Sequence, residues 1–128
     1  MAKGFVINLE DATAQNSNFR KVIYTAHHSQ LVLMCLKPNE EIGMEVHERT
    51  DQFFRVESGK GKVVIDGQEF AVSDGFAVVV PAGAMHNVIN TSDDIPLKVY
   101  TIYMPPHHKD GVVHATKEAA ENDVEDHL

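Results

Sequence analysis

The stretch Gly75–Asn90, which reads GFAVVVPAGAMHNVIN, decides the fold of this chain. Its first half is a short run of β-branched residues that ends at Pro81, where a strand loses a backbone donor. Gly83 then permits a tight turn, and a second run begins at Met85. The stretch therefore predicts two short strands joined by a turn.

The same pattern of short apolar runs and turn residues extends in both directions from this stretch. Asp66-Gly67 is typical of a two-residue hairpin turn, and no alternation of strands with helices appears. The pattern predicts an all-β sandwich or barrel. The predicted strands are Phe5–Asn8, Arg20–Ala26, Gln30–Lys37, Ile42–His47, Gln52–Glu57, Lys62–Asp66, Glu69–Val72, Gly75–Val80, Met85–Asn90 and Leu97–Met104.

The C-terminal segment has a different composition, acidic and rich in alanine. Thr116 is a suitable N-cap, and Glu118 lies in the first turn, where the helix dipole favours a negative charge. We expect residues 1–115 to form one β-domain and residues 116–128 to form a short helix or a solvated tail.

Composition excludes several classes of protein. The 128 residues carry a net charge of −8, without a cluster of basic side chains, so neither nucleic acid nor an anionic membrane is an expected partner. The longest apolar stretch, Phe76–Met85, is interrupted by Pro81 and Gly83 and is too short to span a bilayer. No signal peptide is visible, and Cys35 has no second cysteine to pair with. A cytoplasmic protein is expected.

Four polar residues stand out as candidate metal ligands. Glu45 and His47 lie two apart and share one face of a strand. Gln52 begins the next strand, and His86 lies in the later stretch described above. Imidazole, carboxylate and amide oxygen all bind divalent transition ions. The spacing alone is a weak signal, since a solvated acidic loop and one hydrogen-bonded histidine give the same pattern.

The residues around these four resemble the motifs of a known superfamily. Gly75–Asn90 matches the second cupin motif, G-x5-P-x-G-x2-H-x3-N, at every specified position. The first cupin motif, G-x5-H-x-H-x3–4-E-x6-G, is matched imperfectly, with Asn39, Glu45, His47, Gln52 and Gly59 at its specified positions. Asn is among the few residues besides Gly that tolerate a positive φ.

The resemblance implies a small single-domain cupin of the cupin 2 type, a jelly-roll barrel also called a double-stranded β-helix. It implies one divalent transition metal, held by Glu45, His47, Gln52 and His86. Manganese, iron(II), nickel, cobalt and zinc all suit this ligand set. Asp51 is an alternative to Gln52, because three intervening residues after His47 are also allowed.

The last predicted strand contributes to the same interior. If Lys98 faces water, then Leu97, Val99, Thr101 and Tyr103 point inward. Tyr103 is a candidate proton donor or substrate contact, with a core aromatic as the alternative. The pairs His27-His28 and His107-His108 are expected at the surface, the second pair at the edge of the barrel mouth.

The resemblance implies a metal-dependent enzyme acting on a small oxygenated substrate, a sugar or sugar acid, by isomerase-like or lyase-like chemistry. Similarity to mannose-6-phosphate isomerase is taken as fold analogy, because no basic residue falls on the expected inward face. An iron-dependent dioxygenase and a non-catalytic binding protein are the alternatives. A homodimer is expected, because Phe53 and the run Phe5–Ile7 need covering.

Overall fold

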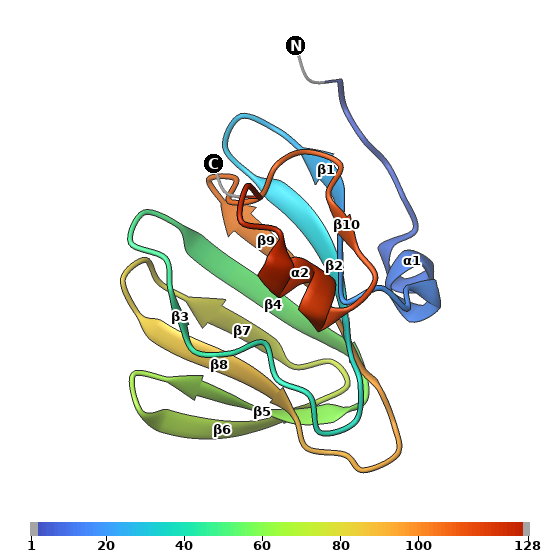
Figure 1. Cartoon of the computed structure of the whole chain (residues 1–128), viewed down its shortest axis with the longest axis vertical. Coiled ribbons are helices and arrows are strands. Elements are labelled where there is room, and N and C mark those ends of the chain that lie inside the picture. The colour runs from blue at the N-terminus through green and yellow to red at the C-terminus, as the bar shows by residue number, and fades with distance from the viewer. Residues whose placement is uncertain (1–2, 127–128) are drawn as a thin grey trace.

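The computed structural model of the chain describes residues 3–126 and arranges them in two antiparallel sheets that face each other (Figure 1). The larger sheet has the strand order β10-β1-β2-β9-β4-β7, and the smaller has the order β3-β8-β5-β6. The strands are β1 (Arg20–Thr25), β2 (Gln30–Leu36), β3 (Glu45–Val46), β4 (Asp51–Ser58), β5 (Lys60–Ile65), β6 (Gln68–Ser73), β7 (Ala77–Val80), β8 (Met85–Asn90), β9 (Leu97–Met104) and β10 (Val113–His114). The helices are α1 (Leu9–Gln15) and α2 (Lys117–Asn122). No helix within residues 3–126 is long and apolar enough to cross a membrane.

The chain passes repeatedly from one sheet to the other. Between β2 and β9, the strands β2, β4, β7 and β9 belong to the larger sheet, and β3, β5, β6 and β8 belong to the smaller. Among these strands, only β5 and β6 follow each other within one sheet. This alternation winds the strands into the predicted double-stranded β-helix. It also brings distant segments together, because β9 pairs along its length with both β2 and β4.

The core lies between the two sheets and is built by alternate residues of each strand. On β9, Leu97, Val99, Thr101 and Tyr103 are buried, whereas Lys98 and Tyr100 between them are partly exposed. The predicted inward face is therefore confirmed. On β4, Phe54 and Val56 are 2% exposed and face the same core.

Two predicted turns have the expected backbone conformations. Asn39, which replaces the leading glycine of the first motif, has φ +63°. Asp66 and Gly67 have φ +47° and +82°, as a type I′ hairpin turn requires. The Asp66 carboxylate also accepts a hydrogen bond from the backbone N–H of Met85, at 2.9 Å, and so fixes the start of β8.

The predicted N-terminal strand Phe5–Asn8 is wrong. Asn8 instead caps α1, since its side-chain oxygen accepts a hydrogen bond from the backbone N–H of Asp11. Capping and the acidic residues of the first turn favour a helix over a strand here. The predicted strand Ile42–His47 is also shorter than expected. Glu45–Val46 forms the strand that pairs with β8, and Gly43, with φ +109°, separates it from the single bridge between Glu41 and Ile89.

The C-terminal helix is present, and Thr116 caps it as predicted, through a hydrogen bond from the backbone N–H of Ala119. The chain beyond it is attached to the barrel, because Asp123 and Asp126 contact His114 and His108. Up to residue 126, the segment is therefore docked and not a solvated tail. Residues 127 and 128 of the predicted segment lie outside the described residues.

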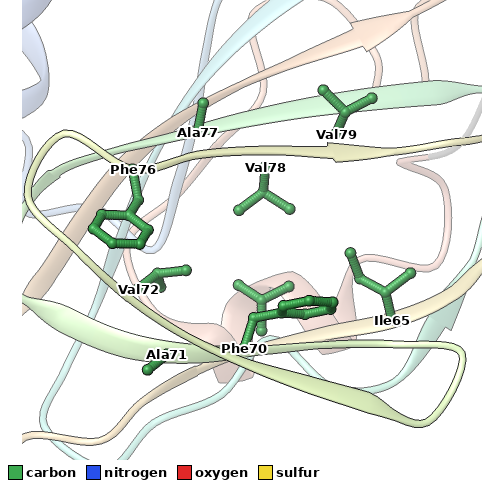
Figure 2. Close-up of a pocket in the computed structure, with 9 residues that line it drawn as sticks. Ile65, Phe70, Ala71, Val72, Phe76, Ala77, Val78 and Val79 are labelled. Carbon is green, nitrogen blue, oxygen red and sulfur yellow. The ribbon is translucent and has the colours of Figure 1, made fainter.

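An apolar hollow of about 270 Å³ lies between β6 and β7, which are the edge strands of the two sheets (Figure 2). Figure 2 shows Val78, Phe70 and Ile65 pointing into it, whereas Ala77 and Val79 point away. Within the described part of the chain, only apolar side chains line this hollow.

Candidate metal centre

The four predicted ligands converge between the two sheets. Glu45 on β3 lies directly opposite His86 on β8, and the rings of His47 and His86 are 5.2 Å apart between centroids. The carboxylate of Glu45 is 3.6 Å from Nε2 of His47. Gln52 reaches the same region from the other sheet.

Gln52 is positioned by its neighbour on β9. It lies opposite Tyr103 in the β4–β9 register, and the Tyr103 ring is 5.8 Å from that of His47. Gln52 and Asp51 are consecutive residues of β4, so their side chains point to opposite faces of the sheet. Gln52 is 2% exposed, whereas Asp51 is exposed and accepts a hydrogen bond from the backbone N–H of Ala82 at 2.8 Å. Gln52, not Asp51, therefore faces the candidate site.

His86 is oriented by a hydrogen bond that its ring donates to the turn before it. Its Nδ1 lies 3.1 Å from the carbonyl oxygen of Ala84, which accepts only. Nδ1 must therefore carry the proton, and Nε2 of the neutral ring keeps a free electron pair. This is the arrangement in which a metal-binding histidine is usually held.

The amide of Gln52 has one satisfied end and one unsatisfied end. Its Nε2 donates to Oγ1 of Thr101 at 3.0 Å, which fixes the orientation of the amide. Its Oε1 is buried, and no donor from residues 3–126 reaches it. Buried acceptors are rarely left without a partner, so this oxygen points to a ligand that the protein atoms do not supply. Two imidazoles, one carboxylate and this amide oxygen fit a divalent transition ion.

Tyr103 lies beside these residues and is 3% exposed. Burial raises the pKa of its phenol, an effect that the positive charge of Arg20 opposes, so Tyr103 stays protonated at neutral pH. Its hydroxyl is 3.2 Å from Nε2 of His108, whose Nδ1 lies 2.7 Å from a carboxylate oxygen of Asp126. With His108 neutral, Nδ1 donates to Asp126 and Nε2 accepts from Tyr103.

The surface prediction holds for one histidine pair and not for the other. His27 and His28 are exposed. His108, however, is 2% exposed, and the ring of His107 is 4.3 Å from that of His47. The position of this pair directly after the last strand was the available signal, but the burial of His108 also depends on Asp126, which lies far along the chain.

The absence of an inward-facing basic residue was also a wrong prediction. Arg20 on β1 is 8% exposed, and it alternates with the buried Val22. It lines a hollow of about 160 Å³ beneath α2, together with Glu45 and His108. Alternation along Arg20–Ala26 was the signal that could have revealed it.

A second group of metal-binding residue types lies at the base of α2. The ligand atoms of His114, Asp123 and Asp126 are within 4.8 Å of one another. Nε2 of His114 donates to Asp123 at 3.0 Å, and this hydrogen bond holds the pKa of Asp123 below its ordinary value. The Asp126 oxygens accept hydrogen bonds from His108 and from the backbone N–H of Lys109. We interpret the group as the attachment of α2 to the barrel.

Comparison with known proteins places these residues in context. The family model for the cupin domain matches residues 32–103, which include all four candidate ligands. The uncharacterized protein YrkC of Bacillus subtilis is 49% identical over 90% of this chain, which spans 64% of that protein's length. The crystal structure of BH2720 from Bacillus halodurans has 43% identity and a TM-score of 0.90, covering 93% of this chain and 94% of its own. KdgF from Halomonas sp. has 25% identity and a TM-score of 0.63, covering 68% and 77% of the two chains.

Proposed function

The chain belongs to the cupin family, and from that premise we propose that it is an enzyme that uses one divalent transition metal on a small oxygenated substrate. The substrate class is a sugar or sugar acid, and the chemistry is of the isomerase or lyase type. The observation that carries the proposal is the buried, unsatisfied Oε1 of Gln52 beside two buried histidines.

The proposed ligands are Glu45, His47, Gln52 and His86. The hydrogen bond to Ala84 leaves Nε2 of His86 as the binding atom, and the hydrogen bond to Thr101 leaves Oε1 of Gln52. Glu45 supplies the one negative charge of the set. When bound, manganese, iron, nickel, cobalt or zinc acts as a Lewis acid that polarises a carbonyl oxygen, a contribution of several kcal/mol.

Tyr103 is proposed to contact the substrate. It is buried next to His47, and its hydroxyl proton is donated to Nε2 of His108, so its oxygen is placed to accept a hydrogen bond from a substrate hydroxyl. Donation of the proton to a substrate oxygen would require the hydrogen bond to His108 to break. His108 and Asp126 act through it as positioning residues, since they fix the direction of that hydroxyl.

The sharpest test of the ligand set uses two adjacent residues that face opposite ways. Metal content per chain is measured by elemental analysis for the wild type, Gln52→Ala and Asp51→Asn. We expect one ion per chain in the wild type and in Asp51→Asn, and a clear loss in Gln52→Ala. Loss in Asp51→Asn with full retention in Gln52→Ala would refute the assignment.

The same preparation distinguishes the proposed reaction from its alternatives. Exchange of substrate hydrogens with deuterated water, followed by NMR on a panel of sugars and sugar acids, reports isomerase-like chemistry with any active metal. Oxygen uptake that occurs with iron alone identifies a dioxygenase. Binding without turnover under every condition identifies a non-catalytic protein.

We also propose that the protein is a cytoplasmic homodimer. Phe53 is partly covered by Tyr100, with ring centroids 6.3 Å apart, but Val6 remains 98% exposed and Phe5 42% exposed. These exposed apolar side chains favour association. A sedimentation mass equal to the 14.2 kDa monomer at micromolar concentration would contradict the dimer.

A further inference from the structure

The hollow beneath α2 contains a buried cation that the proposed metal chemistry does not use. Arg20 of β1 is 8% exposed and lines this hollow, which also borders the candidate ligand Glu45. Figure 1 shows α2 beside β10 and near the start of β1, where the helix covers one end of the barrel. The hollow thus lies between the C-terminal helix and the metal centre.

The guanidinium of Arg20 has few partners. Among residues 3–126, no carboxylate forms an ion pair with it. One terminal nitrogen is 3.4 Å from Nδ1 of His114, and the group lies over the Phe19 ring at 5.3 Å. Its Nε is buried, and no acceptor from the described residues reaches it. An arginine offers five N–H donors, so most of this group's capacity is unused.

The carboxylates near Arg20 are already engaged elsewhere or lie in solvent. The two oxygens of Asp126 accept hydrogen bonds from His108 and Lys109, and Glu45 is directed toward His47. Glu121 is exposed at the rim, where Lys117 adds a second positive charge. The carboxylates that line the hollow outnumber its cations, so the net charge does not attract an anion. The unused donors of the buried Arg20 guanidinium favour an acceptor from outside the chain, because buried donors are rarely left without one.

We propose that Arg20 binds an oxyanion group, a carboxylate or a phosphate, of the small molecule that reaches the metal centre. The planar guanidinium matches either group through two parallel hydrogen bonds. The hollow of about 160 Å³ equals roughly five water volumes, enough for such a group and a few further atoms. That the bound molecule is the substrate rests on the proposed function, whereas binding of the anion does not.

Arg55 provides a matched control. Its Nε also has no hydrogen-bond partner among the described residues, but its side chain is only partly buried. It lies one position from the inward-facing Phe54 on β4 and therefore points to the opposite face. Replacing Arg55 removes the same charge without touching the hollow beneath α2.

The test measures anion binding by calorimetry on protein stripped of metal, with inorganic phosphate and glycolate as probes at low ionic strength. The wild type and Arg55→Gln should bind equally, and Arg20→Gln should bind at least about tenfold more weakly. Arg20→Lys keeps the charge but not the paired donors, so its affinity should fall between the two. The probe that binds more tightly assigns the group as phosphate or carboxylate.

Metal binding is measured separately on the same variants, by titration with cobalt. Arg20→Gln should retain full cobalt binding, so loss of the anion site and failure of the metal centre are distinguishable. Absence of anion binding in the wild type, or equal binding in Arg20→Gln, would overturn the proposal. If Arg20→Gln does not fold, the same comparison between the wild type and Arg20→Lys decides the outcome.

Discussion

Two of the hollows in this protein, one between β6 and β7 and one beneath α2, differ in size and in the chemistry of their linings. The hollow between β6 and β7 measures about 270 Å³ and is lined by apolar side chains. The hollow beneath α2 measures about 160 Å³ and is lined by Arg20, Glu45, His108 and Asp126 among others. Of these two hollows, the smaller one has the polar side chains that could bind a ligand.

The difference has a structural origin. The first hollow lies where two sheet edges fail to meet, and its side chains Phe70 and Phe76 are 42% and 49% exposed. Beside the hollow beneath α2, Ala84, Thr101 and Asp126 each accept a hydrogen bond that fixes one polar side chain of the neighbouring site. Such supporting bonds are what a binding site requires and a gap between strands does not have.

The largest expected effect tests the metal centre, which borders the hollow beneath α2 through Glu45. His86→Ala removes one of the two imidazoles, and we expect metal affinity to fall at least about a hundredfold, since loss of a supporting residue alone costs 10- to 100-fold. A metal titration with a competing chelator measures it. Full metal retention in His86→Ala would remove the basis of the comparison.

A substitution in the apolar hollow should change the stability of the fold and leave metal affinity unchanged. Val78→Ala deletes two methyl groups from a side chain that is 9% exposed and faces the apolar hollow. We expect the free energy of unfolding to fall by about 2 kcal/mol, measured with urea, because buried apolar surface is lost. The cobalt titration should be unchanged, and a change in it would show that the two ends are coupled.

A smaller effect tests the charge of the metal centre. Gln52→Glu adds a second negative ligand, so we expect metal binding to be retained or several-fold tighter and turnover to be slower. The added charge makes the ion a weaker Lewis acid. A competition titration measures the metal affinity, and initial rates measure the turnover. A weaker metal affinity in Gln52→Glu would contradict the expected effect of the added charge.

The smallest effect concerns the attachment of α2. Hydrogen bonding from His114 lowers the pKa of Asp123, so this carboxylate stabilises the fold above the ordinary aspartate pKa of about 4 and loses that contribution as the pH falls below it. Asp123→Asn should therefore speed amide hydrogen exchange in α2 at pH 7, and the difference from the wild type should shrink near pH 3. An unchanged difference at both pH values would show that the hydrogen bond between His114 and the Asp123 carboxylate is not responsible.

Much of the fold could be predicted because local patterns and the motif agreed. The turn at Asp66-Gly67, the positive φ of Asn39 and the inward face of Leu97–Tyr103 all follow from the sequence of a few neighbouring residues. The convergence of Glu45, His47, Gln52 and His86 followed from motif spacing. Whether these residues bind a metal stays a prediction.

The unpredicted features depend on contacts between distant residues or on competing local signals. Asp126 is buried because it meets His108. Local alternation places Arg20 on the inward face of β1 with Val22, but it does not specify that α2 covers it, nor does it specify the contact of Asp126. The short run before Asn8 contains apolar residues typical of a strand, but residues 3–8 pair with no strand of either sheet, and α1 begins only after Asn8.

The strand order has a consequence for how this protein folds. β9 lies between β2 and β4 in the larger sheet, so the centre of that sheet cannot form until Leu97–Met104 is available. Pairing of segments so far apart requires the closure of long loops, which makes folding slow compared with that of helical domains of similar length. During synthesis, β2 and β4 therefore have unpaired edges until Leu97–Met104 has been made, and the larger sheet closes only after that.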